Sequence, residues 1–241
     1  MIELRQLTQL AEFGDVVRLQ RAIWGFEDIE LVPMRFLVVV DRIGGHVFGA
    51  YDGDLMVGFC FAIPGVKPEG RSYLHSHMLG VLPEYRNLGI GQWLKLRQRD
   101  EALSRGIELI EWTFDPLELK NAFYNIERLG AIVRRYSVNH YGVTASPLHG
   151  GLPTDRCIAE WWISTPRVCS ILAGERVRRA PEERIFYPAD IARLRSERPD
   201  CAREVQRSNG ESFQRAFERG LAVTGFEHDA GVARYLLEPW P

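Results

Sequence analysis

Two histidines lie close together in the apolar stretch "YLHSHML", at positions 75 and 77. Alternate side chains of an extended strand share one face, so His75, His77, Leu79 and Val81 are expected on the same side of a strand. An imidazole with a pKa near its ordinary value of about 6.5 removes a proton readily at neutral pH. The pair is therefore a candidate general base for a reaction at the end of this strand.

Two other interpretations of the histidines stay open. A strand histidine is often a core residue whose ring nitrogens are satisfied by neighbouring groups. An H-x-H pair also supplies two metal ligands, but no third histidine, cysteine or carboxylate follows at an obvious spacing. No metal site is predicted.

The glycines of "VLPEYRNLGIGQ", residues 81–92, form the second chemical feature. Pro83 ends the preceding strand, because proline cannot donate to a ladder, and a helical pattern follows Gly91. A glycine-rich turn at a helix N-terminus presents several N–H groups to one anion, with the helix dipole behind them. The sequence lacks the Gly-Lys-Ser/Thr ending of a P-loop, and Leu94 stands where a dinucleotide fingerprint has its third glycine. The turn is therefore a candidate phosphate site of another kind.

The elements that position these residues follow from hydrophobic periodicity. "HVFGAYDGDLMVGFCFAIPG" predicts two strands, near 46–51 and 55–63, joined by the hairpin turn "DGD". Residues 1–145 predict the order β-α-β-β-β-α-β-α-β, a mixed sheet with helices on its faces. After the Gly/Pro-rich segment "ASPLHGGLPTD", residues 146–241 predict strands at "RCIAEWWI", "LAVTGF" and "ARYLL" and a helix near 200–219, as an extension of the same sheet. The tryptophans of "EWWIS" are expected to pack this extension.

Bulk composition limits the partners. The 241 residues are 46% apolar and carry a formal net charge of -2 with a pI of about 6.3, so no global basic field favours nucleic acid or an anionic membrane. The four cysteines show no C-x-x-C spacing, and the N-terminus has neither a basic region nor a long apolar run. We expect a reduced, cytoplasmic protein with no nucleic-acid or membrane partner.

The glycine turn resembles motif A of the GNAT superfamily of acyl-CoA N-acyltransferases, in which an apolar strand end and a proline precede R/Q-x-x-G-x-G/A at the start of a helix. Arg86, Gly89 and Gly91 fill these places without a gap, and the order of elements over about residues 1–140 is similar too. The resemblance implies an α/β (α+β) GNAT fold, which is a mixed, mostly antiparallel sheet flanked by helices, here with a C-terminal α/β extension.

The resemblance also assigns residues to the binding of acetyl-CoA or another acyl-CoA. The amides of the turn would cradle the pyrophosphate and the strand end would meet the pantetheine arm, at positions Leu79, Val81, Arg86, Leu88, Gly89, Ile90, Gly91 and Gln92. On the following helix, Lys95, Arg97 and Arg99 would either meet the 3′-phosphate of the adenosine or form a solvated face.

The H-x-H pair is similar to the paired histidines of arylalkylamine N-acetyltransferases, which relay the amine proton through water, and the place of His75 corresponds to the general-base glutamate of histone-acetylating members. The family's acid is commonly a tyrosine four residues before the glycine that ends the next helix. Ile126 has that place, and Tyr124 lies two residues earlier, about 200° round an ordinary helix. Tyr124 is therefore the candidate acid only with a shifted helix register. Tyr136 and Tyr141 are substitutes, and a thiolate also leaves without an acid.

Glu111 and Asp115, expected on one face of the next strand, are candidates for binding the ammonium group of the acceptor, or else a salt-bridged strand end. The resemblance implies direct transfer of an acyl group, most simply acetyl, from acyl-CoA to the primary amine of a small molecule. The alternatives are a succinyl-CoA-type acyltransferase acting on amino acids and a non-catalytic acyl-CoA sensor module. The missing third glycine disfavours a nicotinamide oxidoreductase.

The C-terminal part resembles that of a bacterial GNAT branch with a similar "HSHMLGV" strand and "FEHD"-like ending. The predicted organisation is an acyl-CoA-binding catalytic domain, 1–145, with an extension, 146–241, packed on the same sheet. The outer strands of such a sheet would allow a homodimer.

Overall fold

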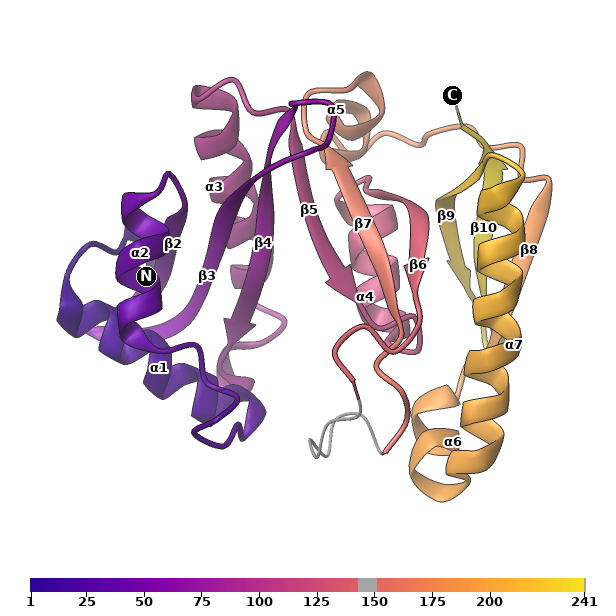
Figure 1. Ribbon diagram of the computed structural model, residues 1–241, viewed down its shortest axis with the longest axis horizontal. Helices are drawn as coiled ribbons and strands as arrows, with labels where there is room; N and C mark the ends of the chain where they lie inside the picture. Colours follow the sequence, from indigo (N-terminus) through magenta and orange to yellow (C-terminus); the bar gives the residue numbers. More distant parts are fainter. Residues whose placement is uncertain (143–150, 241) are drawn as a thin grey trace. The chain divides into compact units, whose positions relative to one another are not determined.

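The computed structural model describes residues 1–142 and 151–240, which form two compact units, Met1–Glu111 and Trp112–Pro241. The boundary predicted after residue 145 lies outside the described residues, and the proposed division into catalytic domain and extension stays a prediction. The mixed α/β architecture with a mostly antiparallel sheet, flanking helices and additional C-terminal strands is confirmed (Figure 1).

The N-terminal unit orders its strands β1-β2-β3-β4-β5, and all neighbours are antiparallel except β4 and β5, which are parallel. Strand β5 continues across the boundary into the second unit. The elements are β1 (Ile2–Gln6), α1 (Leu10–Trp24), α2 (Met34–Arg42), β2 (His46–Asp52), β3 (Leu55–Val66), β4 (Ser72–Val81), the 3-10 turn η1 (Pro83–Tyr85), α3 (Ile90–Ser104) and β5 (Leu109–Phe114).

The hairpin of β2 and β3 turns at Gly53, whose φ of +59° is a left-handed conformation that glycine adopts at little cost. This confirms the prediction from "DGD". Helix α2 was not predicted, because the β-branched run Val38–Val40 is typical of a strand. Leu37 and Val40 lie three positions apart and are both buried, so the segment forms an amphipathic helix whose apolar face carries these two residues.

Helices α1 and α3 cover opposite faces of this sheet. A Cβ added at Gly80 of β4 would meet Trp24 and Ile23 of α1, whereas the neighbouring Leu79 approaches Gly91 of α3. Successive strand residues point to opposite faces, so the two helices lie on opposite sides of β4. Glycine at position 80 is required because the Trp24 ring lies directly over the strand there.

The second unit orders its strands β7-β6-β9-β10-β8, antiparallel at each pair whose register is known. Its helices α5 and α6 and strand β8 were not predicted. Its elements after β5 are α4 (Leu119–Phe123), the π-helix η2 (Tyr124–Arg128), β6 (Ile132–Ser137), β7 (Arg156–Trp162), α5 (Pro166–Leu172), β8 (Glu183–Pro188), α6 (Ile191–Glu197), α7 (Pro199–Glu218), β9 (Leu221–His228) and β10 (Val232–Pro239).

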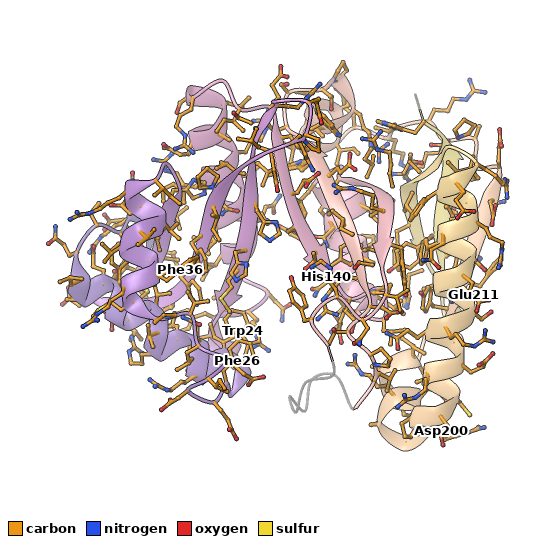
Figure 2. All side chains as sticks on the ribbon, viewed as in Figure 1. Trp24, Phe26, Phe36, His140, Asp200 and Glu211 are labelled. Carbon is orange, nitrogen blue, oxygen red and sulfur yellow. The ribbon has the colours of Figure 1, made fainter. Side chains whose placement is uncertain are left out.

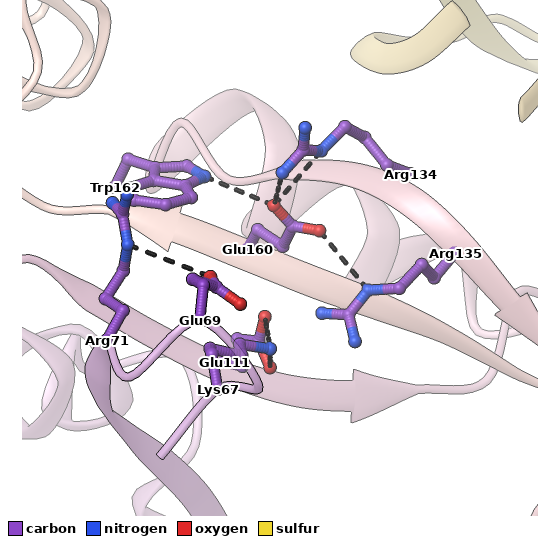
Figure 3. A network of polar contacts seen from close by, with 8 residues as sticks. All are labelled: Lys67, Glu69, Arg71, Glu111, Arg134, Arg135, Glu160 and Trp162. Carbon is purple, nitrogen blue, oxygen red and sulfur yellow. Dashed lines mark hydrogen bonds and ion pairs between the residues drawn. The ribbon is translucent and has the colours of Figure 1, made fainter. Parts of the chain in front are cut away.

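The tryptophans of β7 pack this unit, as predicted. Trp161 is fully buried, contacts Trp112 edge-on at 6.1 Å between ring centroids, and donates its indole N–H to the Leu129 carbonyl at 2.6 Å. Trp162 donates its indole N–H to the buried Glu160 carboxylate at 3.2 Å, which also accepts from two arginines of β6 (Figure 3). Both rings are therefore structural. None of the helices in the described part of the chain has the length and apolar character to cross a membrane.

Candidate active site

The glycine turn leads from β4 into α3 through two left-handed residues. Asn87 has a φ of +64° and Gly89, the N-cap of α3, a φ of +83°. Asparagine tolerates this region better than other side chains and glycine tolerates it freely, which explains these two residue types. The Trp93 N–H donates to the Gly89 carbonyl at 3.0 Å and closes the first helical turn.

The N–H groups from Leu88 to Gln92 lie at the start of α3. No backbone acceptor is found for any of them within the described residues, as expected for the start of a helix. The first turn of α3 carries no acidic side chain, and the neighbouring Arg86 is exposed and donates only to the Val81 carbonyl at 3.3 Å among the contacts known for it. The arrangement suits an anion such as a phosphate.

Strand β4 contains a β-bulge at His77. Ala62 of β3 pairs with Ser76 and the next residue, Phe61, pairs with Met78, so His77 is the extra residue on β4. A bulge breaks the alternation of side chains along a strand. Ser76 and Leu79 consequently both face α3, three positions apart.

The predicted common face of His75, His77, Leu79 and Val81 is therefore wrong. The two histidine rings are neighbours, 5.7 Å apart between centroids, and His77 lies 5.3 Å from the Phe61 ring. This face of the sheet is the one covered by α1, whereas Leu79 lies on the α3 face. The bulge separates the histidines from the side chain of Leu79 but keeps all three on one strand.

Aromatic side chains gather on the face of the sheet that α1 covers, where His75 also pairs in register with Glu111 of β5. Trp24 stacks on Phe26 at 5.5 Å and meets Phe59 edge-on at 5.8 Å between ring centroids (Figure 2). Although His77 is exposed, partial loss of hydration lowers the pKa of its imidazole, which lies beside the Phe61 ring. A lowered pKa leaves the ring neutral at neutral pH, which is the state that accepts a proton.

The helix residues proposed for the 3′-phosphate behave differently from one another. Lys95 is buried and donates to the Ser76 hydroxyl at 2.8 Å, so its assignment to a phosphate at the surface is wrong. Arg97 lies 3.6 Å from Glu101 and over the Phe48 ring. This arginine fits the alternative of an ordinary, ion-paired helix face.

Glu111 is engaged by a lysine of the same unit. The ammonium group of Lys67 lies 2.7 Å from both oxygens of the buried Glu111 carboxylate and 4.4 Å from the centroid of Tyr73 (Figure 3). A carboxylate paired in this way is not a free anchor for an acceptor amine. The geometry favours the alternative, a salt bridge on the strand.

Comparison with known families identifies this architecture. The model of the Acetyltransferase (GNAT) family matches residues 13–131, which include α1, the bulged strand β4, the glycine turn and α3. Residues 13–131 are a GNAT acetyltransferase domain. The chain is therefore an acetyltransferase enzyme, and acyl-CoA N-acetyltransfer is the general activity that the domain indicates.

Solved structures show the same fold at low sequence identity. The ribosomal-protein-S18-alanine N-acetyltransferase from Escherichia coli is 19% identical, with a TM-score of 0.53 over 68% of this chain and 96% of its own. A GNAT acetyltransferase from Streptococcus pneumoniae is 13% identical, with a TM-score of 0.54 over 66% and 98%. An Arabidopsis thaliana protein bound to the bisubstrate analogue CoA-Ac-MVNAL is 17% identical, with a TM-score of 0.51 over 66% and 97%. No curated protein matches the sequence.

The C-terminal end of the GNAT domain contains a π-helix that begins at the candidate acid, Tyr124. Residues Tyr124–Arg128 form a π-helix, and the Leu129 N–H donates to the Tyr124 carbonyl five residues earlier, at 3.1 Å. A π-helix turns less per residue than an α-helix and is frequent at functional sites. The Tyr124 hydroxyl is buried with no hydrogen-bond partner among the described residues, and burial raises its pKa. It is therefore a neutral O–H donor without an acceptor among the described residues.

The other predicted polar residues of the second unit have partners. Tyr136 donates to the Asp155 carboxylate at 2.7 Å, and the hydroxyl of Tyr141 lies 2.9 Å from that of Thr113. Asp115 lies 3.3 Å from Arg195 and accepts the Leu117 N–H at 2.8 Å, although burial raises its pKa. Tyr124 is the one candidate of this set whose polar atom lacks a partner within the described residues.

No cysteine thiolate accompanies the histidines in the N-terminal unit. Cys60, the only cysteine of this unit, is fully buried on the α3 face, and burial raises the pKa of its thiol to about 12. A thiol in this environment is not a nucleophile. Within the described residues no group of three or more histidine, cysteine or acidic side chains gathers as a metal site would require.

Proposed function

We propose that the protein transfers an acyl group, most simply acetyl, directly from acyl-CoA to the primary amine of a small molecule. The observation that carries this proposal is the pairing of two features on one short segment. The histidine pair lies on β4. The N–H groups of Leu88 to Gln92, for which no backbone acceptor is found within the described residues, begin seven residues after the end of that strand. One extended acyl-CoA molecule would contact both.

The glycine turn would bind the pyrophosphate through its backbone. Arg86 would add a positive charge at the same place, since guanidinium groups are good partners for phosphate. The pantetheine arm would run along the backbone of β4 near Leu79 and Val81. In this arrangement the thioester would lie toward the bulge at His77.

His75 and His77 would act as the general base. The amine attacks the thioester carbonyl carbon, a nitrogen–carbon bond forms, the carbon–sulfur bond breaks, and the proton lost by the amine passes to an imidazole. The CoA thiolate leaves with the bonding electrons and is protonated by Tyr124 or by water. No covalent acyl-enzyme is part of this scheme, because none of the four cysteines falls in the glycine-turn motif, and sequential rather than ping-pong kinetics are expected.

The first experiment is a calorimetric titration of the protein with acetyl-CoA and with succinyl-CoA, using NADH as the negative control. Binding of one CoA ester and not of NADH supports the assignment of the turn and names the acyl group. A screen of small amines, read by release of free thiol, then identifies the acceptor. If neither ester binds, the turn is purely structural and the proposal fails.

Replacement of both histidines separates an enzyme from an acyl-CoA sensor. The variant His75→Ala with His77→Ala is expected to bind acetyl-CoA like the parent protein, because the turn is untouched. An enzyme loses turnover in this variant. Unchanged turnover in this variant would contradict the assignment of the two histidines as the base.

A further inference from the structure

Three polar side chains that are linked by hydrogen bonds are buried between β4 and α3. Lys95 donates to the Ser76 hydroxyl at 2.8 Å, and Ser76 donates to the Gln98 side-chain oxygen at 2.9 Å. All three residues are at most 5% exposed. Cys60 of β3 lies beside them and packs its thiol near the Leu94 carbonyl of α3.

The middle member of this chain lies next to the bulge. Ser76 is the last residue of β4 in regular register with β3 before His77, which is the extra residue. The Ser76 hydroxyl points to α3, whereas the His77 ring lies on the opposite face beside Phe61. The hydrogen bonds to α3 therefore fix β4 on the side opposite the His77 ring, at the residue just before the bulge.

We propose that Lys95 is a positioning residue which, through Ser76, fixes the β4 bulge and thereby the orientation of His77. The structural part of this inference is independent of the proposed function, and only its effect on turnover rests on that function. Lys95 itself is on the far side of the strand from the imidazoles and does not touch the reacting atoms.

The physical argument concerns register. A bulge has an alternative arrangement in which the extra residue moves by one place, and the side chains at the old and new positions then change face. If the bulge moved to Ser76, the hydroxyl would leave Lys95 and Gln98 in an apolar environment without this link. Buried polar groups that lose their partners are costly, so the chain disfavours the moved bulge more than an apolar contact would.

The same chain also accounts for a lysine in a helix core. A purely hydrophobic residue at position 95 would fill the space at no desolvation cost, but would tolerate either position of the bulge. The buried side chains of Lys95 and Gln98 both need a hydrogen-bond partner at the position of the Ser76 hydroxyl. The network is thus a device for a unique backbone arrangement rather than for stability.

The test compares Ser76→Thr with Ser76→Val, two side chains of nearly equal shape that differ by one hydroxyl. Lys95→Met is the second variant, with Lys120→Met, an exposed lysine of the second unit, as its control. Amide hydrogen exchange at residues 76–79 is measured without any ligand. Ser76→Thr and Lys120→Met are expected to match the parent protein, whereas Ser76→Val and Lys95→Met should exchange about tenfold faster or more at these amides.

Turnover supplies the second readout. For Ser76→Val and Lys95→Met the kcat is expected to fall about tenfold or more through misplacement of His77, while the Kd for acetyl-CoA stays near that of the parent protein. Equal exchange and equal kcat for Ser76→Thr and Ser76→Val would overturn the inference. If the parent protein shows no turnover, the proposed function fails, and the exchange measurement still decides whether the network fixes the bulge.

Discussion

The imidazole rings of His75 and His77 lie 5.7 Å apart between centroids, although a bulge at His77 interrupts the strand that carries both. The bulge turns Leu79 toward α3 while the rings stay on the face covered by α1. The strand can therefore offer backbone groups to an acyl-CoA arm on one part and imidazoles to an amine on another. Direct transfer from thioester to amine needs the bound thioester and the base within reach of the same amine.

Loss of the base should reduce turnover without affecting CoA binding. His77→Ala is expected to lower kcat by a factor of roughly 10² to 10⁴, the range typical of general-base removal. Because the folded-state pKa of His77 is lowered, the parent enzyme should keep its activity below pH 6.5 and lose it only as the pH falls through that lowered pKa. Steady-state kinetics across pH check both points. A fall in activity that begins above pH 7 would contradict the assignment of His77.

The glycine turn can be tested by comparing CoA with pantetheine, which lacks the pyrophosphate. A Cβ at Gly91 would lie 3.6 Å from Leu79, an ordinary contact, so Gly91→Val should fold normally. Its γ-methyl groups would hinder approach to the amides, and the Kd for CoA should rise roughly ten- to a hundredfold, as for the loss of one or two hydrogen bonds to a charged group. Calorimetry should show no change for pantetheine. Equal weakening of both ligands would mean that the turn does not bind the pyrophosphate.

Tyr124→Phe separates catalysis from stability. Removal of a buried hydroxyl that has no hydrogen-bond partner should leave the free energy of unfolding unchanged or raise it by about 1 kcal/mol. If Tyr124 protonates the leaving thiolate, the same substitution should lower kcat about tenfold or more. Urea unfolding and steady-state kinetics give the two values. An unchanged kcat would show that the thiolate leaves without this acid.

The stability of the parent protein should rise between about pH 7 and pH 9. Burial lowers the pKa of Lys95 to about 7, so in this range the unfolded chain binds a proton that the folded protein does not. The expected slope is roughly 1.4 kcal/mol per pH unit. Above pH 9 the effect is offset, because burial raises the pKa of Cys60 to about 12 and the unfolded thiol ionises first. Urea unfolding of Lys95→Met should show no such rise, and the Lys120→Met control should retain it.

Acid should destabilise the protein through His46. Burial lowers the pKa of His46 to about 3, and both of its ring nitrogens lack hydrogen-bond partners within the described residues. Below pH 6.5 His46 therefore binds a proton in the unfolded chain but not in the folded chain, and the free energy of unfolding falls as the pH drops toward 3. His46→Phe, which keeps the stacking on Phe48, should be more stable at pH 5 and less sensitive to pH. Thermal unfolding of the two proteins between pH 6.5 and pH 3 checks this prediction.

The glycine turn and the strands around it were predictable because their signals are local. Gly89 adopts a left-handed conformation that few other residues tolerate, and "DGD" specifies a hairpin without help from distant residues. The bulge at His77 was not predictable, because it depends on which residue of β3 faces which residue of β4. Alternation alone therefore placed Leu79 on the wrong face.

Which charged residues are buried could not be predicted from the sequence either. Lys95 and Arg97 stand two residues apart on α3 and look alike in a list of basic residues, yet one lies in the core and the other at the surface. The distinction arises from the rotation of the helix against β4, which sets Lys95 over Ser76. Likewise the π-helix at Tyr124 has no signal in "NAFYNIERLGA", since its wider turn is fixed by tertiary packing.

Strand β6 has consequences for any attempt to shorten the protein. It lies between β7 and β9, both of which come from residues beyond the segment that matches the family, and Val133 pairs with Val223 some ninety positions later. A fragment that stops at residue 145 would leave both sides of β6 with bare backbone N–H and C=O groups, which recruit strands from other molecules. A fragment that ends at residue 145 is therefore expected to aggregate.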